Sequence, residues 1–298
     1  MYLIMDSLDK FRQSGKIARQ VKKYARPLVK EGAKALDIAE AVEAKIVSLG
    51  GKPAFPVDVS VNDMAAHYVP IVEDALTLKK GDLVKIDLGV HVDGCVTDTA
   101  FSVSIGKNAE NEKLIKASDE ALKIATSMAK PGVRLKEIGA AVEKKIMSYG
   151  FEPIRNLNGH GVGEWTIHSA PSIPSFDNGN TQKLKEGQII AIEPFATTGS
   201  GYVKSGKGSG IYSLHSRGNV RQFREVLEWV KSEYKTLPFA KRHVANKFGK
   251  LKAGLALKLF VAKGIIKEYS TLPEDTKGCK VSQSEHTVII ADKPEILT

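Results

Sequence analysis

Two aspartates flank a strong signal for a β-hairpin. Asp93-Gly94 is a favoured two-residue turn between β-branched segments, and the pairing that it sets places Asp98 opposite Gly89. Asp87 then lies diagonal to Asp98 on the same face, because side chains alternate along a strand. Diagonal neighbours are roughly 7–8 Å apart at the backbone, so the two carboxylates could share a pair of metal ions. The alternative is two solvated aspartates on the surface of a sheet.

Three further residues strengthen the metal hypothesis. Glu193 closes the apolar run QIIAIEP, Glu285 precedes the β-branched end of SQSEHTVII, and His160 stands among glycines in NLNGHGVG. Each residue alone is more commonly a strand-end acid or a hydrogen-bonded histidine. Together with the two aspartates they form an oxygen-rich set with one imidazole. Such a set suits Mn, Fe(II), Co or Zn as a divalent cofactor, rather than a structural zinc site.

The segments that must position these residues repeat within the chain. Residues 32–50 and 132–150 are identical at nine of nineteen positions, and both have the spacing of a helix with one apolar face that ends at a glycine. Residues 78–87 and 184–193 form a second repeat in the same order, and each ends in one of the candidate carboxylates. Two repeats in one order indicate an internal duplication. We therefore expect a pseudo-two-fold domain with a site in the cleft between its halves.

The composition is that of an ordinary globular protein. The chain has 298 residues, of which 42% are hydrophobic and 26% charged, which excludes collagen, coiled coils and extensive disorder. Its two cysteines, Cys95 and Cys279, exclude a disulfide scaffold and fit a reducing compartment. The first residues lack the pattern of an export signal, and no apolar run reaches the roughly 18 residues of a membrane helix. We therefore expect a soluble, cytoplasmic protein.

The net charge of +10 is concentrated in one segment. Residues 199–272 contain 15 Lys and Arg residues, Arg217 among them, and four Glu residues. The segment begins with a Gly/Ser/Lys run that predicts a loop. Three helical patterns follow, over residues 220–230, 238–248 and 255–261. The sequence therefore predicts a basic helical subdomain at 199–272, inserted into a domain of residues 1–198 and 273–298.

Five motifs resemble those of one enzyme family, the methionine aminopeptidases of type II, and the chain resembles the archaeal members most. The motifs are PAFPVDVSVNDMAAHYVP (53–70), IDLGVHVDGCVTDTA (86–100), NLNGHGVG (156–163), IEPFA (192–196) and SEHTVI (284–289). The resemblance covers nearly the whole chain. It implies an α+β pita-bread fold whose pseudo-two-fold symmetry agrees with the duplication. It also implies that the basic insertion is a winged-helix-like subdomain.

The resemblance assigns a role to each candidate ligand. Asp87 would hold the second of two divalent metal ions, and Asp98 and Glu285 would bridge the pair. His160 and Glu193 would complete the first metal ion. A hydroxide between the metals would be the nucleophile, and Glu193 would be the proton shuttle.

Two more histidines and an aromatic residue also match the family. His67 in AAHYVP and His168 in WTIHSAP would position the peptide and stabilise the oxyanion. Taken alone, His67 is more commonly structural. Phe55 would form a wall of an apolar pocket for the methionine side chain. The implied substrates are nascent proteins that begin with Met and a small second residue.

Two other functions fit the same fold. An Xaa-Pro-type peptidase is disfavoured because only residues 1–31 precede the first repeat helix. A non-catalytic ribosome-binding or RNA-binding protein is disfavoured because all five ligand positions are intact. The basic insertion could contact the ribosome, although a solvated basic face that shields the cleft is the commoner explanation of such charge. We expect a monomer with no membrane partner.

Overall fold

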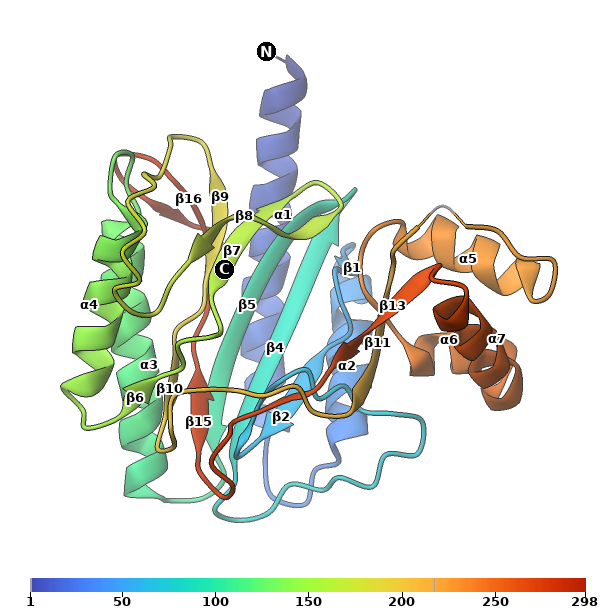
Figure 1. Cartoon of the computed structure of the whole chain (residues 1–298), viewed down its shortest axis with the longest axis horizontal. Coiled ribbons are helices and arrows are strands. Elements are labelled where there is room, and N and C mark those ends of the chain that lie inside the picture. The colour runs from blue at the N-terminus through green and yellow to red at the C-terminus, as the bar shows by residue number, and fades with distance from the viewer. Residues whose placement is uncertain (1, 217) are drawn as a thin grey trace.

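The computed structural model describes residues 2–216 and 218–298, so Arg217 lies outside the described residues (Figure 1). The helices are α1 (Tyr2–Ala25), the 3-10 helix η1 (Arg26–Leu28), α2 (Ala35–Ser48), α3 (Ala109–Met128), α4 (Leu135–Met147), α5 (Arg224–Tyr234), α6 (Lys241–Phe248) and α7 (Lys250–Ala262). The strands are β1 (Lys52–Pro53), β2 (Asp58–Val61), β3 (Met64–Ala66), β4 (Leu83–Val92), β5 (Cys95–Ser104), β6 (Glu152–Pro153), β7 (Gly159–Gly163), β8 (Thr166–Ile173), β9 (Ile189–Ile192), β10 (Phe195–Thr197), β11 (Gly208–Leu214), β12 (Phe239–Ala240), β13 (Ile266–Ser270), β14 (Leu272–Pro273), β15 (Val281–Gln283), β16 (His286–Ile289) and β17 (Glu295–Ile296). No helix within the described residues is both long and apolar enough to cross a membrane.

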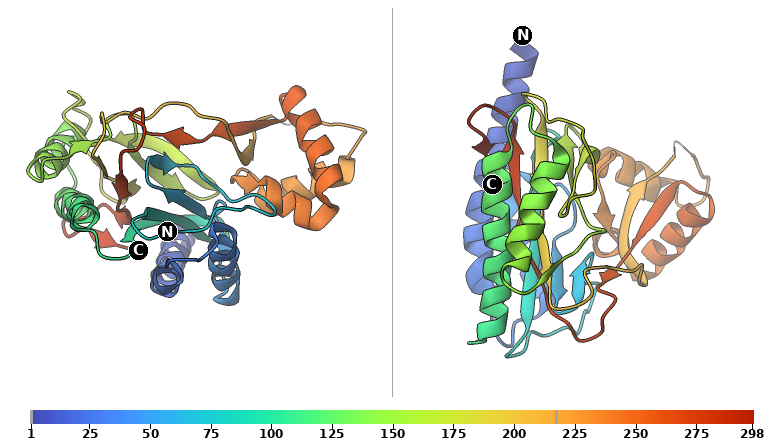
Figure 2. Two further views of the ribbon diagram at one scale, coloured as in Figure 1. Left: turned by 90° about the horizontal axis from the view of Figure 1, so that it is seen from below. Right: turned by 60° about the vertical axis from the view of Figure 1, so that its left-hand side comes forward.

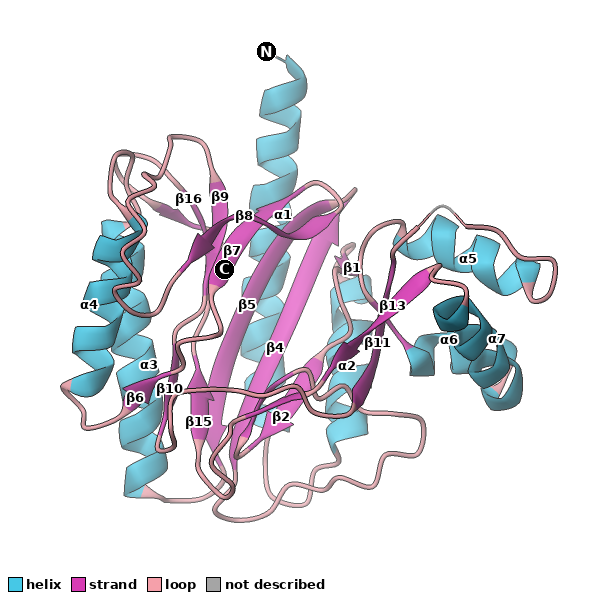
Figure 3. Cartoon of the chain, viewed as in Figure 1, coloured by secondary structure: helices cyan, strands magenta, loops and turns pink. Residues whose placement is uncertain are grey.

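The strands form a central layer that is flanked by helices. Helices α1 and α2 lie behind the strands of the first half, α3 and α4 lie at the left edge, and the elements of the insertion lie at the right (Figures 2 and 3). In the first half, β4 pairs with β1, β2 and β5. In the second half, β9 pairs with β7 and β16, while β10 lies between β6 and β15. This mixed architecture confirms the predicted α+β class.

The two halves repeat each other in detail. The backbone N–H of Gly32 donates to the carbonyl of Leu78 at 2.9 Å, and Gly132 donates to Leu184 at the same distance. These bonds join the start of each repeat helix to the second repeated segment. Gly50 and Gly150 follow α2 and α4 with φ of 85° and 77°, where a glycine is needed. The predicted duplication therefore corresponds to two structurally equivalent halves.

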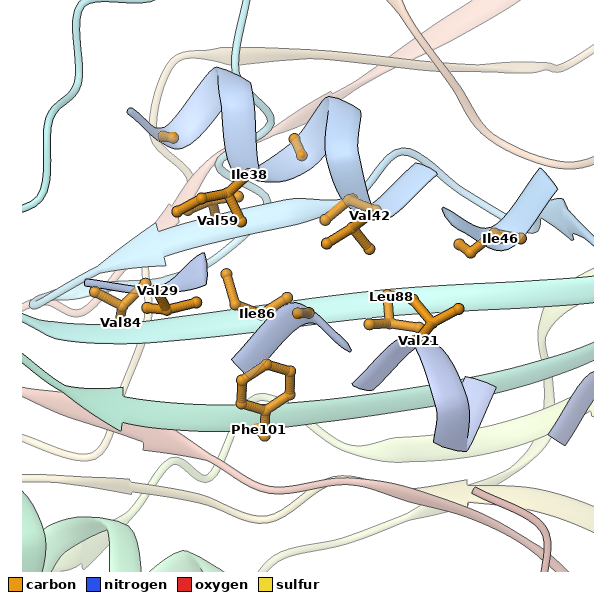
Figure 4. Close-up of a cluster of buried hydrophobic side chains, with 14 of the residues drawn as sticks. Val21, Val29, Ile38, Val42, Ile46, Val59, Val84, Ile86, Leu88 and Phe101 are labelled. Carbon is orange, nitrogen blue, oxygen red and sulfur yellow. The ribbon is translucent and has the colours of Figure 1, made fainter. Parts of the chain in front are cut away.

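Each repeat helix buries its apolar face against a separate core. On α2, Ile38, Val42 and Ile46 pack in one cluster with the apolar face of β4 (Figure 4). Their counterparts on α4 belong to a second cluster with Ile190 and Ile192 of β9. Full burial of such side chains stabilises the fold by roughly 1.5–3 kcal/mol each. The two cores leave the opposite face of the strands for polar residues.

The hairpin of β4 and β5 has the predicted register. Asp93 and Gly94 form the turn, with φ of 50° and 92°, as a type I′ turn requires. Asp98 pairs with Gly89, and Asp87 pairs with Ala100. Both aspartates therefore lie on the face of the hairpin opposite to the core.

The insertion contains a small sheet as well as helices. Strand β11 pairs with β12 and β13, and it begins inside the Gly/Ser/Lys run that predicted only a loop. The second helix begins at Lys241 rather than Pro238, which is a correction to the prediction. Residues 239–240 pair with β11 instead, because the extended backbone at Ala240 precedes the first turn of α6. These helices and strands enclose a cluster of their own, and the boundaries 199 and 272 stay a prediction.

A buried ion cluster joins the insertion to the first half. The Arg242 guanidinium, only 1% exposed, donates to Oε1 of Glu43 on α2, and the His243 ring lies 3.1 Å from Oε2 of the same carboxylate. Burial would raise the pKa of Glu43, but His243 and Arg242 hold it below its usual value. The insertion is therefore tied to α2 through buried charged groups.

Candidate metal centre and substrate cavity

A cavity of about 320 Å³ lies on the polar face of the strands. Seven of the eight site residues predicted from the sequence line it: Phe55, His67, Asp87, Asp98, His160, His168 and Glu193. The eighth, Glu285, is only 1% exposed and is not part of the lining. Single ligand atoms of Asp98, His160 and Glu285 all fall within 4.8 Å of one another. The structure therefore brings together candidate ligands that lie up to nearly two hundred positions apart in the sequence.

Separate strands supply the charged groups. Asp87 lies on β4, Asp98 on β5 and His160 on β7, whereas Glu193 follows β9 and Glu285 connects β15 to β16. The glycines on either side of His160 permit this approach. A Cβ at residue 159 would overlap the carbonyl of residue 191, and one at residue 161 would overlap the carbonyl of residue 170.

The four carboxylates are crowded and poorly solvated. Burial raises the pKa of Asp87 to about 6. Burial and repulsion from the neighbouring acids raise the pKa values of Asp98, Glu193 and Glu285 well above their usual range. Among the described residues, no hydrogen-bond partner reaches Oδ1 of Asp87, Oδ1 of Asp98 or Oε2 of Glu285. These oxygens lack the donors that buried carboxylates normally require.

The unprotonated ring nitrogen of His160 faces the cluster of carboxylates. Its Nδ1 lies 3.3 Å from the carbonyl of Gly161, which can only accept, so Nδ1 carries the proton. Burial and the neighbouring His168 lower the pKa of His160 to about 3, so the ring is neutral. Its Nε2 lies 3.7 Å from Asp98 and 3.6 Å from Glu193. An imidazole lone pair facing two carboxylates is repulsive, and a divalent cation between them would remove the repulsion. The donor set thus fits a divalent metal ion.

Gln283 is a site residue that the sequence reasoning missed. It is 1% exposed, and its side-chain amide donates to Asp87 Oδ2 at 3.0 Å and approaches Glu193 Oε2 at 3.5 Å. It therefore orients one carboxylate from each half of the duplication. Gln283 lies two positions before Glu285 in a strand-like segment, and this alternation was a signal that could have revealed it.

Asp58 is a second residue that was missed. It pairs in register with Asp87, lines the cavity and accepts hydrogen bonds from the Ser60 hydroxyl at 2.6 Å and from the backbone N–H of His67. Burial and the charge of Asp87 raise its pKa to about 7. His67 has a φ of 65°, which is unfavourable for a residue with a side chain. Asp58 thus helps to stabilise the unfavourable backbone conformation of His67, which is a predicted site residue.

The two histidines beside the metal ligands occupy different surroundings. Nδ1 of His67 donates to the carbonyl of Ser270 at 3.0 Å, which leaves Nε2 as an acceptor. Burial lowers the pKa of His67. His168 is exposed at the mouth of the cavity, with its ring 4.5 Å from that of His160. The cavity walls still desolvate His168, and together with His67 they lower its pKa to about 4.

The rest of the cavity wall is mostly apolar. Phe55 packs against the backbone of Gly89, where a Cβ would overlap the ring. Phe195 and Ile167 add further apolar surface. The predicted insertion contributes the opposite wall through Ile211, Pro238, Tyr269 and Leu272. An apolar side chain and a charged group could therefore be bound together.

The model of metallopeptidase family M24 matches residues 9–227. The chain belongs to this family. A curated M24 relative, the methionine aminopeptidase of Pyrococcus abyssi, is 43% identical over 98% of this chain and 99% of its own length. The match to the family confirms the predicted class of enzyme, a metallopeptidase.

Solved structures agree on the fold. A methionine aminopeptidase from Thermotoga maritima superposes with a TM-score of 0.72 at 24% identity, covering 98% of this chain and 96% of its own. A thermophilic Arx1 superposes with a TM-score of 0.85 at 18% identity, covering 98% and 90%. At such low sequence identity these structural similarities establish the M24 fold only. The substrate has to be inferred from the residues of the site.

Proposed function

We propose that the chain removes the N-terminal methionine from peptides whose second residue is small. The observation that carries the proposal is the convergence of five potential metal ligands beside an apolar cavity. The similarity to a methionine aminopeptidase over nearly the full length of both chains supports it.

Two divalent cations fit the charged end of the cavity. Asp98, His160, Glu193 and Glu285 would hold one ion, and Asp87 would hold the second together with Asp98 and Glu285. When bound, such ions supply Lewis acidity that polarises a carbonyl oxygen and lowers the pKa of water. The cations would also neutralise the repulsion among the four acids. The donor set accepts Mn, Fe(II), Co or Zn.

The protein residues then orient the peptide and move protons. Nε2 of His67 can accept the N–H of the scissile amide, because Nδ1 is committed to Ser270. His168 at the mouth can donate to the carbonyl oxygen as negative charge develops there. Glu193 faces the same end of the cavity as the other acids and can pass a proton to the leaving amine.

The apolar wall supports the proposed preference for methionine. Phe55 and Phe195 would contact an unbranched side chain, and Met makes favourable contacts with aromatic rings. The free amine of the substrate would lie next to the carboxylates, which restricts cleavage to the first residue.

The test uses metal-stripped protein and the peptides Met-Ala-Ser, Met-Leu-Ser and Ala-Pro-Ala. We expect release of free Met from Met-Ala-Ser after addition of Mn, Fe(II), Co or Zn, and little release from Met-Leu-Ser. Asp98→Asn and Glu193→Gln should abolish release. Glu186→Gln, which changes an exposed acid close in sequence, is the matched control. Cleavage of Ala-Pro-Ala alone would replace the proposal with an Xaa-Pro-type peptidase.

The basic insertion could place this activity near its substrates. We propose that residues 199–272 bind ribosomal RNA as nascent chains emerge, with the enzyme acting as a cytoplasmic monomer. The net positive charge of this segment supports the proposal. Cosedimentation with ribosomes at low salt should be lost after charge reversal at Lys258 and Lys263. Unchanged cosedimentation would assign the charge to a solvated surface.

A further inference from the structure

A second hollow lies on the helical side of the strands, away from the substrate cavity. Its volume is about 630 Å³, and it is lined by Arg19, Lys22, Lys23, Arg26, Pro27, His286 and Thr298. The four cations come from α1 and η1, whereas the last two residues come from β16 and the segment after β17. Neither the predicted metal centre nor the basic insertion contains this group.

The spacing of the four cations brings their charges together. Arg19 and Arg26 each lie three and four positions from Lys22 and Lys23, which are consecutive, so both arginines lie about 5–6 Å from the lysines on the same side of the helix. Among the side chains described in residues 7–216 and 218–298, no acidic group lies at ion-pair distance from any of the four. Arg26 repels Lys22, and Glu285 and Asp119 attract Lys22 from beyond ion-pair distance. A bound anion would offset the positive charge that remains on Arg19, Lys23 and Arg26.

Local structure accounts for only part of this arrangement. The dipole at the C-terminal end of α1 favours cations in its last turn, where Lys22 and Lys23 lie. Arg19 and Arg26 fall outside that turn. Each gives one N–H to a backbone carbonyl, Arg19 to Leu297 and Arg26 to Ser102. A guanidinium has five N–H donors, so both keep donors for a ligand.

The base of the hollow is ordered by hydrogen bonds. Lys22 Nζ donates to the Thr99 hydroxyl at 2.9 Å, and this hydroxyl donates to the carbonyl of Glu285 at 2.8 Å. Nδ1 of His286 lies 3.2 Å from the hydroxyl of Thr298, which is 3% exposed. Lys22 is therefore fixed in place, whereas Lys23 and Arg26 remain exposed at the rim.

We propose that this hollow binds an anion that carries two or three phosphate groups. A single carboxylate would offset one of the four positive charges, whereas a pyrophosphate group can meet several cations at once. Arginine suits this role because its planar fork binds two phosphate oxygens together. The concave shape, with cations on one side and buried hydroxyls at the base, favours a small ligand over an extended strand of nucleic acid.

The experiment measures pyrophosphate binding to the full chain by calorimetry. EDTA is present in excess, so that metal ions at the other site cannot recruit the ligand. We expect binding to one site, with affinity reduced more than tenfold in Lys23→Glu/Arg26→Glu. The control Lys123→Glu/Lys144→Glu makes the same change in net charge at exposed positions on α3 and α4, and it should bind within twofold of the unaltered protein. Circular dichroism verifies that each variant is folded.

Other results would overturn the proposal. An equal loss in both double variants would mean that net charge, rather than the hollow, attracts the ligand. Absence of pyrophosphate binding would mean that Arg19 serves only to hold the backbone at Leu297. A comparison with ADP identifies the source of the phosphates. Equal affinity for ADP and pyrophosphate supports recognition of phosphates alone, and tighter binding of ADP supports a nucleotide.

Discussion

Replacing Gln283 with leucine tests whether a buried amide organises the metal centre. Leucine is one bond shorter than glutamine, fills most of the same space and cannot donate a hydrogen bond. The substitution removes the donor at 3.0 Å from Asp87 Oδ2 and the weaker contact at 3.5 Å with Glu193. Both carboxylates would then be less solvated and less precisely oriented.

The expected loss can be worked out from the stronger bond. A hydrogen bond to a charged group contributes about 1.5–3 kcal/mol, and loss of a residue that orients metal ligands typically lowers affinity about 10- to 100-fold. The two figures agree, because each factor of ten corresponds to about 1.4 kcal/mol. We expect Mn affinity to fall by about this factor in Gln283→Leu.

The assay titrates metal-stripped protein with Mn at fixed pH and measures both binding and peptidase activity. Activity at saturating Mn should recover in large part, because none of the five ligands is altered. Gln13→Leu, at an exposed position of α1, is the matched control. A folded Gln283→Leu protein that binds Mn within twofold of the unaltered chain would refute the reasoning.

Three more predictions follow from the same structure. Gly89→Ala should displace the Phe55 ring and raise KM for Met-Ala-Ser about tenfold or more, as steady-state kinetics would show; an unchanged KM would exclude Phe55 from the pocket. Glu43→Ala should lower the free energy of unfolding in urea by about 3–5 kcal/mol, because Arg242 is left buried without a counter-charge; the double variant with Arg242→Met should lose less. Metal affinity should increase as pH rises from 5 to 8, by up to roughly tenfold per pH unit for each proton displaced, because the raised pKa values keep protons on the acids at low pH. Calorimetric titrations at several pH values would contradict this reasoning if the affinity stayed constant.

Local chemistry made part of the site predictable. The Asp93-Gly94 turn determines the register of a hairpin, so the relation between Asp87 and Asp98 follows from a few neighbouring residues. The duplicated segments likewise located Glu193 from its counterpart. These inferences depend on turn geometry and on the period of the strand, which act over short stretches of chain.

Other features depend on contacts between segments that are distant in the sequence. Asp58 is a site residue only because β2 pairs with β4, and a single sequence does not specify this pairing. The sheet of the insertion was missed because β11, β12 and β13 are far apart in sequence and β12 has only two residues. The basic hollow was missed for a different reason. Charge was summed along the chain, where acids elsewhere cancel the cations of α1, whereas electrostatic interaction depends on distance in space.

The arrangement of the cores explains how the chain tolerates its metal centre. Four acids with raised pKa values would destabilise any small hydrophobic core that enclosed them. Here they lie between two separate apolar clusters, one packed on α2 and the other on α4, and neither cluster contains a metal ligand. Each half can therefore be stabilised by its own burial of apolar surface. The polar region between the halves keeps carboxylate oxygens that have no hydrogen-bond donor and that a cation would bind. Duplication of a stable half supplies both cores at once, and ligands from the two copies can meet in the region between them.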